Sequence, residues 1–132
     1  MTKRAWFRLL PAIIWAITLA ILMLLPQDSF PESKLLSYDK IAHLGVFALL
    51  SILIMFGTSR VKAFNKTKRS SWLWPLIICI LYSSSLELLQ NFSPGRMIDL
   101  YDFIANVTGG IFGVIVFSIF IKNNLVISKL ML

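Results

Sequence analysis

Four apolar runs, each close to 20 residues long, limit what this sequence can fold into. Hydrophobic residues make up 58% of the 132 residues and charged residues only 14%. A water-soluble domain of this length could not bury so much apolar surface in its core. A bilayer solves this problem, because a helix of ~20 apolar residues crosses it with its backbone hydrogen bonds satisfied internally. The sequence therefore predicts an all-α membrane protein, a bundle of four transmembrane helices at about residues 6–25, 40–57, 72–90 and 102–121.

The segments between these runs are short, so residues 1–132 are expected to form a single transmembrane domain. The first run follows basic residues, as a signal peptide does, but it ends in Leu24, Leu25 and Pro26 without a small-x-small cleavage site. It is therefore predicted to be an uncleaved span. The single Cys79 lies within the third run, which excludes an intramolecular disulfide and predicts a buried apolar role.

The distribution of charge orients the predicted bundle. The N-terminal segment, the loop at 58–71 and the C-terminal tail hold ten of the thirteen basic residues, whereas all six acidic residues lie in or beside the other two loops. The positive-inside rule therefore predicts cytoplasmic N- and C-termini, with residues 26–40 and 87–102 outside. The net charge of +7 is then explained by Lys and Arg residues that flank the membrane on the cytoplasmic side. Nucleic acid is not an expected partner. The protein is therefore predicted to lie in the cell membrane, which its chain crosses several times.

Polar residues collect where the third and fourth runs meet. Asp99, Asp102 and Asn106 are spaced three and four residues apart, which places them on one face of a helix. A row of polar groups entering an apolar helix is costly unless it faces something polar. We interpret it as one wall of a site on the extracytoplasmic side. The opposite wall is expected to come from Asp39, Lys40 and His43.

His43 is the only histidine and lies one helical turn after Asp39. A carboxylate beside an imidazole fixes its tautomer and suits general acid–base chemistry. Glu87, near the end of the third run, is the expected acid–base partner, so His43, Glu87 and Asp39 are the candidate catalytic residues. The alternatives are structural: Asp39 and Asp102 would complement helix dipoles, and Glu87 would pair with Arg96.

Other polar residues of these loops and helix ends are candidates for binding substrate. The two cations among them suit a phosphate or carboxylate, and the amides either bind substrate or join helices. Gly109 and Gly113 form a small-xxx-small pair, which favours close helix packing. The candidate substrate-binding residues are Lys40, Gln90, Arg96, Asp99, Asp102 and Asn106.

No metal site and no other cofactor is predicted. The chain lacks a second histidine and has no cysteine in the outer loops, so the usual zinc patterns are absent. An oxygen-rich site for Mg2+ or Ca2+ from Glu87, Asp99 and Asp102 is not supported by their spacing. The serines at 83–85 and Ser93 carry no nucleophile motif.

These residues together resemble the VanZ-like family of small bacterial membrane proteins, which is named for a member associated with teicoplanin resistance. The resemblance extends from about residue 26 to residue 113. It rests on the order and spacing of three motifs: Asp39-Lys40-x-x-His43-x-x-x-Phe47, Glu87-x-x-Gln90, and Arg96-x-x-Asp99-x-x-Asp102-x-x-x-Asn106-x-x-Gly109.

The resemblance implies a role in glycopeptide resistance or in modification of the cell envelope. Besides the lipid bilayer, the expected partners are a cell-wall precursor, a lipid head group or a glycopeptide antibiotic. Two functions stay open: an enzyme that uses His43 and Glu87 for acid–base chemistry, or a non-catalytic binder of an anionic lipid head group, antibiotic or envelope protein. A purely structural role of the polar residues is the third alternative.

Overall fold

The computed structural model describes residues 3–26, 35–59 and 68–123, with the side chains of residues 5, 35–38, 68 and 121–123 left out. Helices are the regular secondary structure of these segments, and each helix contains a stretch long and apolar enough to cross a bilayer. The predicted all-α membrane fold with four helices is thereby confirmed. The helices are α1 (Lys3–Leu24), α2 (Leu35–Thr58), α3 (Lys68–Gln90) and α4 (Leu100–Asn123).

The helices begin earlier than the apolar runs. α2 starts at Leu35 rather than near residue 40, and α3 starts at Lys68 rather than at residue 72. The apolar spans themselves, such as Asp39–Thr58 and Arg69–Gln90, agree with the predicted runs. Hydropathy marks the part of a helix that suits lipid, whereas backbone hydrogen bonding continues into its polar flanks. As a result, Asp39 lies in the second turn of α2, and the alternative that it complements the helix dipole from the first turn is wrong.

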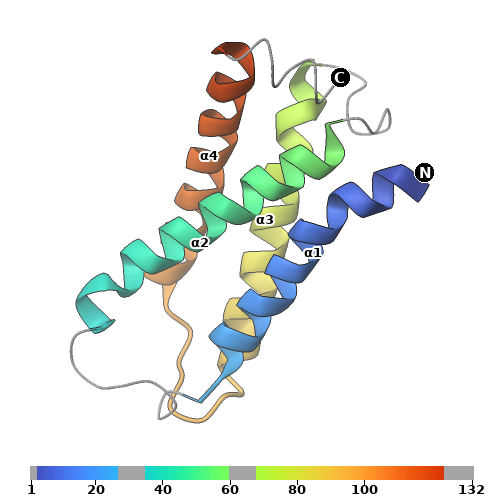
Figure 1. The fold of residues 1–132 in the computed structure, drawn as a ribbon. Coiled ribbons are helices and arrows are strands. Elements are labelled where there is room, and N and C mark those ends of the chain that lie inside the picture. Colours follow the sequence, from blue (N-terminus) through green and yellow to red (C-terminus); the bar gives the residue numbers. More distant parts are fainter. Residues whose placement is uncertain (1–2, 27–34, 60–67, 124–132) are drawn as a thin grey trace.

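α2 occupies the centre of the bundle and contacts each of the other three helices, α4 most extensively. Half of the residues in its span are buried, compared with 17% in the span of α1. Figure 1 shows α2 running diagonally across the molecule, with α1 on one side and α4 on the other. The end of α3 and the starts of α2 and α4 lie toward the same end of the bundle, the lower end in this view.

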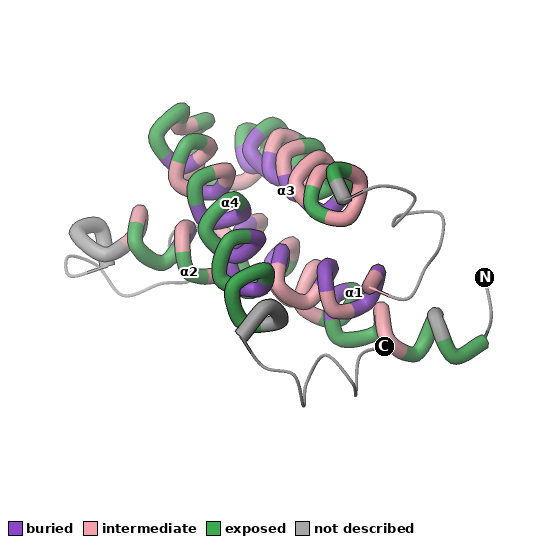
Figure 2. The backbone as a smooth tube through the Cα atoms, turned by 90° about the horizontal axis from the view of Figure 1, so that it is seen from above, coloured by how far each residue is buried: buried purple, intermediate pink, exposed green. Residues whose placement is uncertain are grey.

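The helices turn their buried faces toward one another and their exposed faces away from the bundle, as Figure 2 shows. Phe47 and Leu50 of α2 pack with Leu19 of α1 and Leu86 of α3 in the main core cluster. Cys79 is fully buried in the same cluster, as predicted. Large apolar side chains remain exposed along the outside, which is the surface that a helix bundle presents to lipid.

Two glycines bring α4 against the backbone of α2. A Cβ atom at Gly109 would overlap the carbonyl of Leu44, and one at Gly113 would overlap the carbonyl of Ala48 and the hydroxyl of Ser51. This close approach confirms the packing role predicted for the small-xxx-small pair. The close approach also fixes the register of α4 against α2. It therefore determines which polar residues of the two helices meet one turn before Gly109.

Candidate functional site

The polar end of the bundle is built from the start of α2, the end of α3 and the start of α4. His43 is 7% exposed, and Glu87 and Asn106 are more deeply buried still. Burial of several ionisable or amide groups in membrane helices is costly, and it marks this cluster as a candidate site. At least seven of the nine predicted catalytic or substrate-binding residues contact another member of that set by hydrogen bond or ion pair. These are Asp39, Lys40, His43, Asp99, Asp102 and Asn106, and Glu87 joins them through Asn106.

His43 has a different kind of partner at each ring nitrogen. Its Nδ1 lies 2.7 Å from Oδ1 of Asn106. An amide oxygen only accepts hydrogen bonds, so Nδ1 carries a hydrogen and donates it. The other nitrogen, Nε2, is 3.5 Å from Oδ1 of Asp39 and 3.8 Å from Oδ2 of Asp102. A neutral imidazole therefore presents the lone pair of Nε2 to two carboxylates.

Asn106 connects α2 to α3 and has no exposed surface. Its Nδ2 donates to Oγ of Ser83 at 2.9 Å and to Oε1 of Glu87 at 3.3 Å, while its oxygen holds His43. These three contacts set the orientation of the amide. Since Asn106 is completely enclosed, it positions His43 and Glu87 and does not touch a molecule outside the bundle.

Lys40 neutralises two carboxylates of α4. Its Nζ donates to Oδ2 of Asp99 at 2.7 Å and also to Oδ1 of Asp102. The hydrogen bond from Lys40 holds the pKa of Asp99 below its usual range. Asp99 also caps α4, because its Oδ1 accepts the backbone N–H of Tyr101 at 2.8 Å. Asp102 lies in the first turn of α4, as expected, but the cap itself is Asp99.

Two predicted substrate-binding residues donate hydrogen bonds to the end of α1. Nε2 of Gln90 donates to the carbonyl of Met23 at 3.0 Å, and Nε of Arg96 donates to the carbonyl of Leu25 at 3.0 Å. Satisfying carbonyls at a helix C-terminus is a structural task. For Gln90 this geometry agrees with the alternative that amides join helices, since the side chain is 2% exposed.

The members of the site differ in their exposure. The side chains of Asp39, Lys40 and Asp99 are 40–43% exposed, whereas those of His43 and Asp102 are 8% and 11% exposed. A ligand therefore meets the first three residues before it reaches the imidazole.

Ser83 is a member of the cluster that sequence reasoning did not place there. It was considered only as one of several nucleophile candidates, yet it is fully buried and accepts a hydrogen bond from Asn106. Its spacing of four residues from Glu87 puts both on one face of α3. The spacing from Glu87 is the signal in the sequence that could have placed Ser83 in the cluster. Its partner, Asn106, follows only from the packing of α3 against α4.

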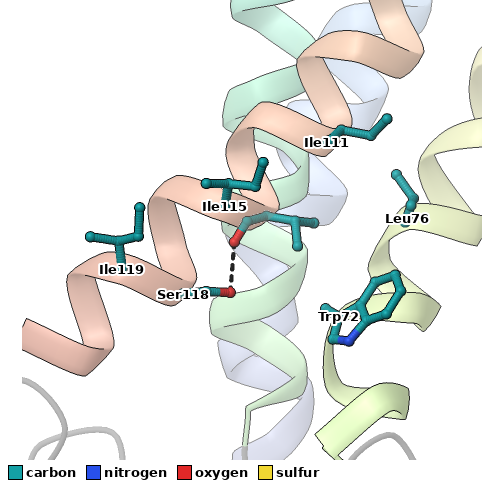
Figure 3. Close-up of a pocket in the computed structure, with 7 residues that line it drawn as sticks. Trp72, Leu76, Ile111, Ile115, Ser118 and Ile119 are labelled. Atoms are coloured by element: carbon teal, nitrogen blue, oxygen red, sulfur yellow. Dashed lines mark hydrogen bonds between the residues drawn. The ribbon is translucent and has the colours of Figure 1, made fainter.

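An apolar groove of about 350 Å3 lies away from this cluster, between the first half of α3 and the second half of α4 (Figure 3). Its walls include Trp72 and Leu76 of α3 and a row of isoleucines on α4. The hydroxyl of Ser118 is bonded to the carbonyl of Val114 within its own helix. These walls suit hydrocarbon and supply no acid–base group, so the groove is separate from the candidate site.

Comparison with known proteins identifies the family. A family model described as VanZ/LLP1 matches residues 4–121, nearly the whole chain. The chain belongs to this VanZ-like family. Neither the curated proteins nor the solved structures contain a match. Membership in the VanZ-like family agrees with the motif resemblance and with the membrane-helix bundle, and it covers every residue of the polar cluster.

Proposed function

We propose that this VanZ-like membrane protein acts on a molecule of the cell envelope, or on a glycopeptide antibiotic, with the polar cluster as its working site. The observation that carries the proposal is the placement of His43. It is buried in a membrane helix, its Nδ1 is held by Asn106, and its Nε2 faces Asp39 and Asp102. An imidazole fixed in this way is prepared to exchange a proton through Nε2.

Glu87 is the proposed second acid–base group. It shares Asn106 with His43, so one amide positions both groups. The substrate enters beside Asp39, Lys40 and Asp99, where the site is open. A cell-wall precursor or lipid head group with a phosphate or carboxylate would draw on Lys40, which then has to exchange one of its present carboxylate partners for the ligand.

The distribution of charge supports an extracytoplasmic position for this site. Its loops hold the acidic residues, whereas the basic residues gather in the segments that belong to the opposite end. A site on the outer face meets envelope precursors and glycopeptides without their entry into the cell.

The test is teicoplanin susceptibility in cells that lack the protein, carry it, or carry His43→Ala or Glu87→Gln. Membrane abundance is quantified in every strain. Protection by the wild type, with its loss in variants of normal abundance, is the expected result. Full protection by both variants at normal abundance would contradict the proposed chemistry.

Non-catalytic binding is the second candidate, and it is favoured by the exposure of Lys40 between two carboxylates. A binder of an anionic lipid head group, an antibiotic or an envelope protein uses charge and shape without proton transfer. Lys40→Ala and Arg96→Ala would then reduce protection, whereas Glu87→Gln, which keeps the shape of the side chain, would have a mild effect.

A further inference from the structure

We infer that Asp39, His43 and Asp102 form a binding site for a first-row divalent cation, with Zn2+ as the reference ion. The inference goes beyond the proposed function and does not depend on it. One ligand atom from each of these residues lies within 4.8 Å of the other two, and the residues come from two different helices. Imidazole and carboxylate together are ligands that Zn2+ and similar ions prefer.

The two distances from His43 fit a metal ion between the side chains. With metal–nitrogen and metal–oxygen bonds of ~2.1 Å, two ligands of a tetrahedral ion stand ~3.4 Å apart. Nε2 of His43 is 3.5 Å from Oδ1 of Asp39 and 3.8 Å from Oδ2 of Asp102. Both distances are too long for good hydrogen bonds and close to this ligand spacing.

The surrounding residues already orient the ligands as a metal site requires. A histidine that binds a metal usually donates its other ring N–H to an oxygen, and His43 does so to Asn106. Asp102 gives Oδ1 to Lys40, which leaves Oδ2 on the side of His43. Two of the three proposed ligands, His43 and Asp102, are therefore held by their neighbours before any ion arrives.

A buried oxygen atom provides independent evidence that the cluster lacks a partner. Oε2 of Glu87 is enclosed and has no hydrogen-bond partner among the described residues. Its carboxylate interacts electrostatically with His43 and Asp102, and its other oxygen is bonded to Asn106. A metal ion beside His43, or water bound to that ion, would give Oε2 a positive or donating neighbour.

The charges of the cluster also favour binding of a divalent cation. Three carboxylates, those of Asp39, Asp99 and Asp102, lie within ion-pairing distance of Lys40 or His43, and Lys40 supplies the one ammonium among them. Such an excess of negative charge is costly near lipid, and a divalent cation reduces it. Three protein ligands also leave a coordination position open, as in sites where a metal activates water. A bound ion would occupy Nε2 and would supply an activated water for proton exchange in its place.

The test measures Zn2+ binding to the full-length protein, purified in detergent with a tag free of histidine and cysteine and stripped with a chelator. Titration against a chromophoric chelator is expected to show one saturable Zn2+ per chain. His43→Ala and Asp39→Asn are expected to weaken binding at least about tenfold, and Asn106→Ala to weaken it through the orientation of His43. Thr108→Ala, an exposed change on α4, is the control and should bind as the wild type does.

Asp39→Asn keeps the test decisive if His43→Ala does not fold, because Asp39 is partly exposed and its amide has nearly the same shape. Substitution by Co2+ adds a second measurement, since its visible spectrum reports nitrogen coordination. Absence of saturable binding, or equal binding by the wild type and Asp39→Asn, overturns the inference. Binding is measured without any assay of resistance, so a failed metal site and a failed resistance role are distinguishable.

Discussion

Single residues determine the geometry of the polar cluster, and Asn106 bonds three of its members. It holds Nδ1 of His43 with its oxygen and binds Ser83 and Glu87 with its nitrogen. The contact between His43 and Asp39 follows from their spacing along one helix, so the sequence alone predicts it. The contact between His43 and Asn106 joins residues 63 positions apart and depends on how α4 packs against α2.

Replacing Asn106 by alanine is expected to destabilise the protein markedly. The change leaves the N–H of His43 and an oxygen of Glu87 buried without their partner, which costs about 1–3 kcal/mol for each group. Thermal unfolding in detergent measures the effect. Thr108→Ala is the control, because Thr108 is exposed and its hydroxyl is bonded only to Ile104 of its own helix among the described contacts. Equal unfolding temperatures for the two variants would show that Asn106 is not a central support.

Packing between elements decides which polar residues meet. Apolar runs predict that helices form and cross the membrane, because their length matches the bilayer. They do not predict the register between helices, since that depends on contacts of particular atoms. Gly109 and Gly113 supply those contacts here by admitting the backbone of α2. For the same reason, the positions of Gln90 and Arg96 at the end of α1 could not be read from spacing.

Gly113→Ala is expected to destabilise the bundle, although alanine is the better helix former by about 1 kcal/mol. The added methyl group would overlap the carbonyl of Ala48 and force α4 away from α2. Gly45→Ala is the matched control, because a Cβ at Gly45 meets nothing within 4 Å. The two substitutions should therefore change the unfolding temperature in opposite directions. A stabilising effect at both positions would contradict the close approach of the two helices.

Across the whole molecule, the polar and basic ends of the bundle are separate. The starts of α2 and α4, the end of α3 and the loop at 91–99 carry the candidate site. At the other end the start of α1 meets the end of α2, where Arg8 bonds Ser59 at 3.1 Å. The structure thus places the described residues of the predicted outer segments, 35–40 and 87–102, at one end of a bundle with four candidate spans. The prediction of which end faces the outside rests only on the positive-inside rule. That rule describes how a chain is inserted into the membrane and not how its helices pack.

Labelling of introduced cysteines tests this orientation. Cys79 is the only natural cysteine and is fully buried, so it should not react in the folded protein. Phe92→Cys places a thiol in the 91–99 loop, where the natural side chain is 83% exposed, and Arg69→Cys places one at an exposed position in the first turn of α3. A membrane-impermeant maleimide should label Phe92→Cys in intact cells and Arg69→Cys only after permeabilisation. The reverse pattern would put the candidate site in the cytoplasm, and a role at the outer face of the membrane would then be untenable.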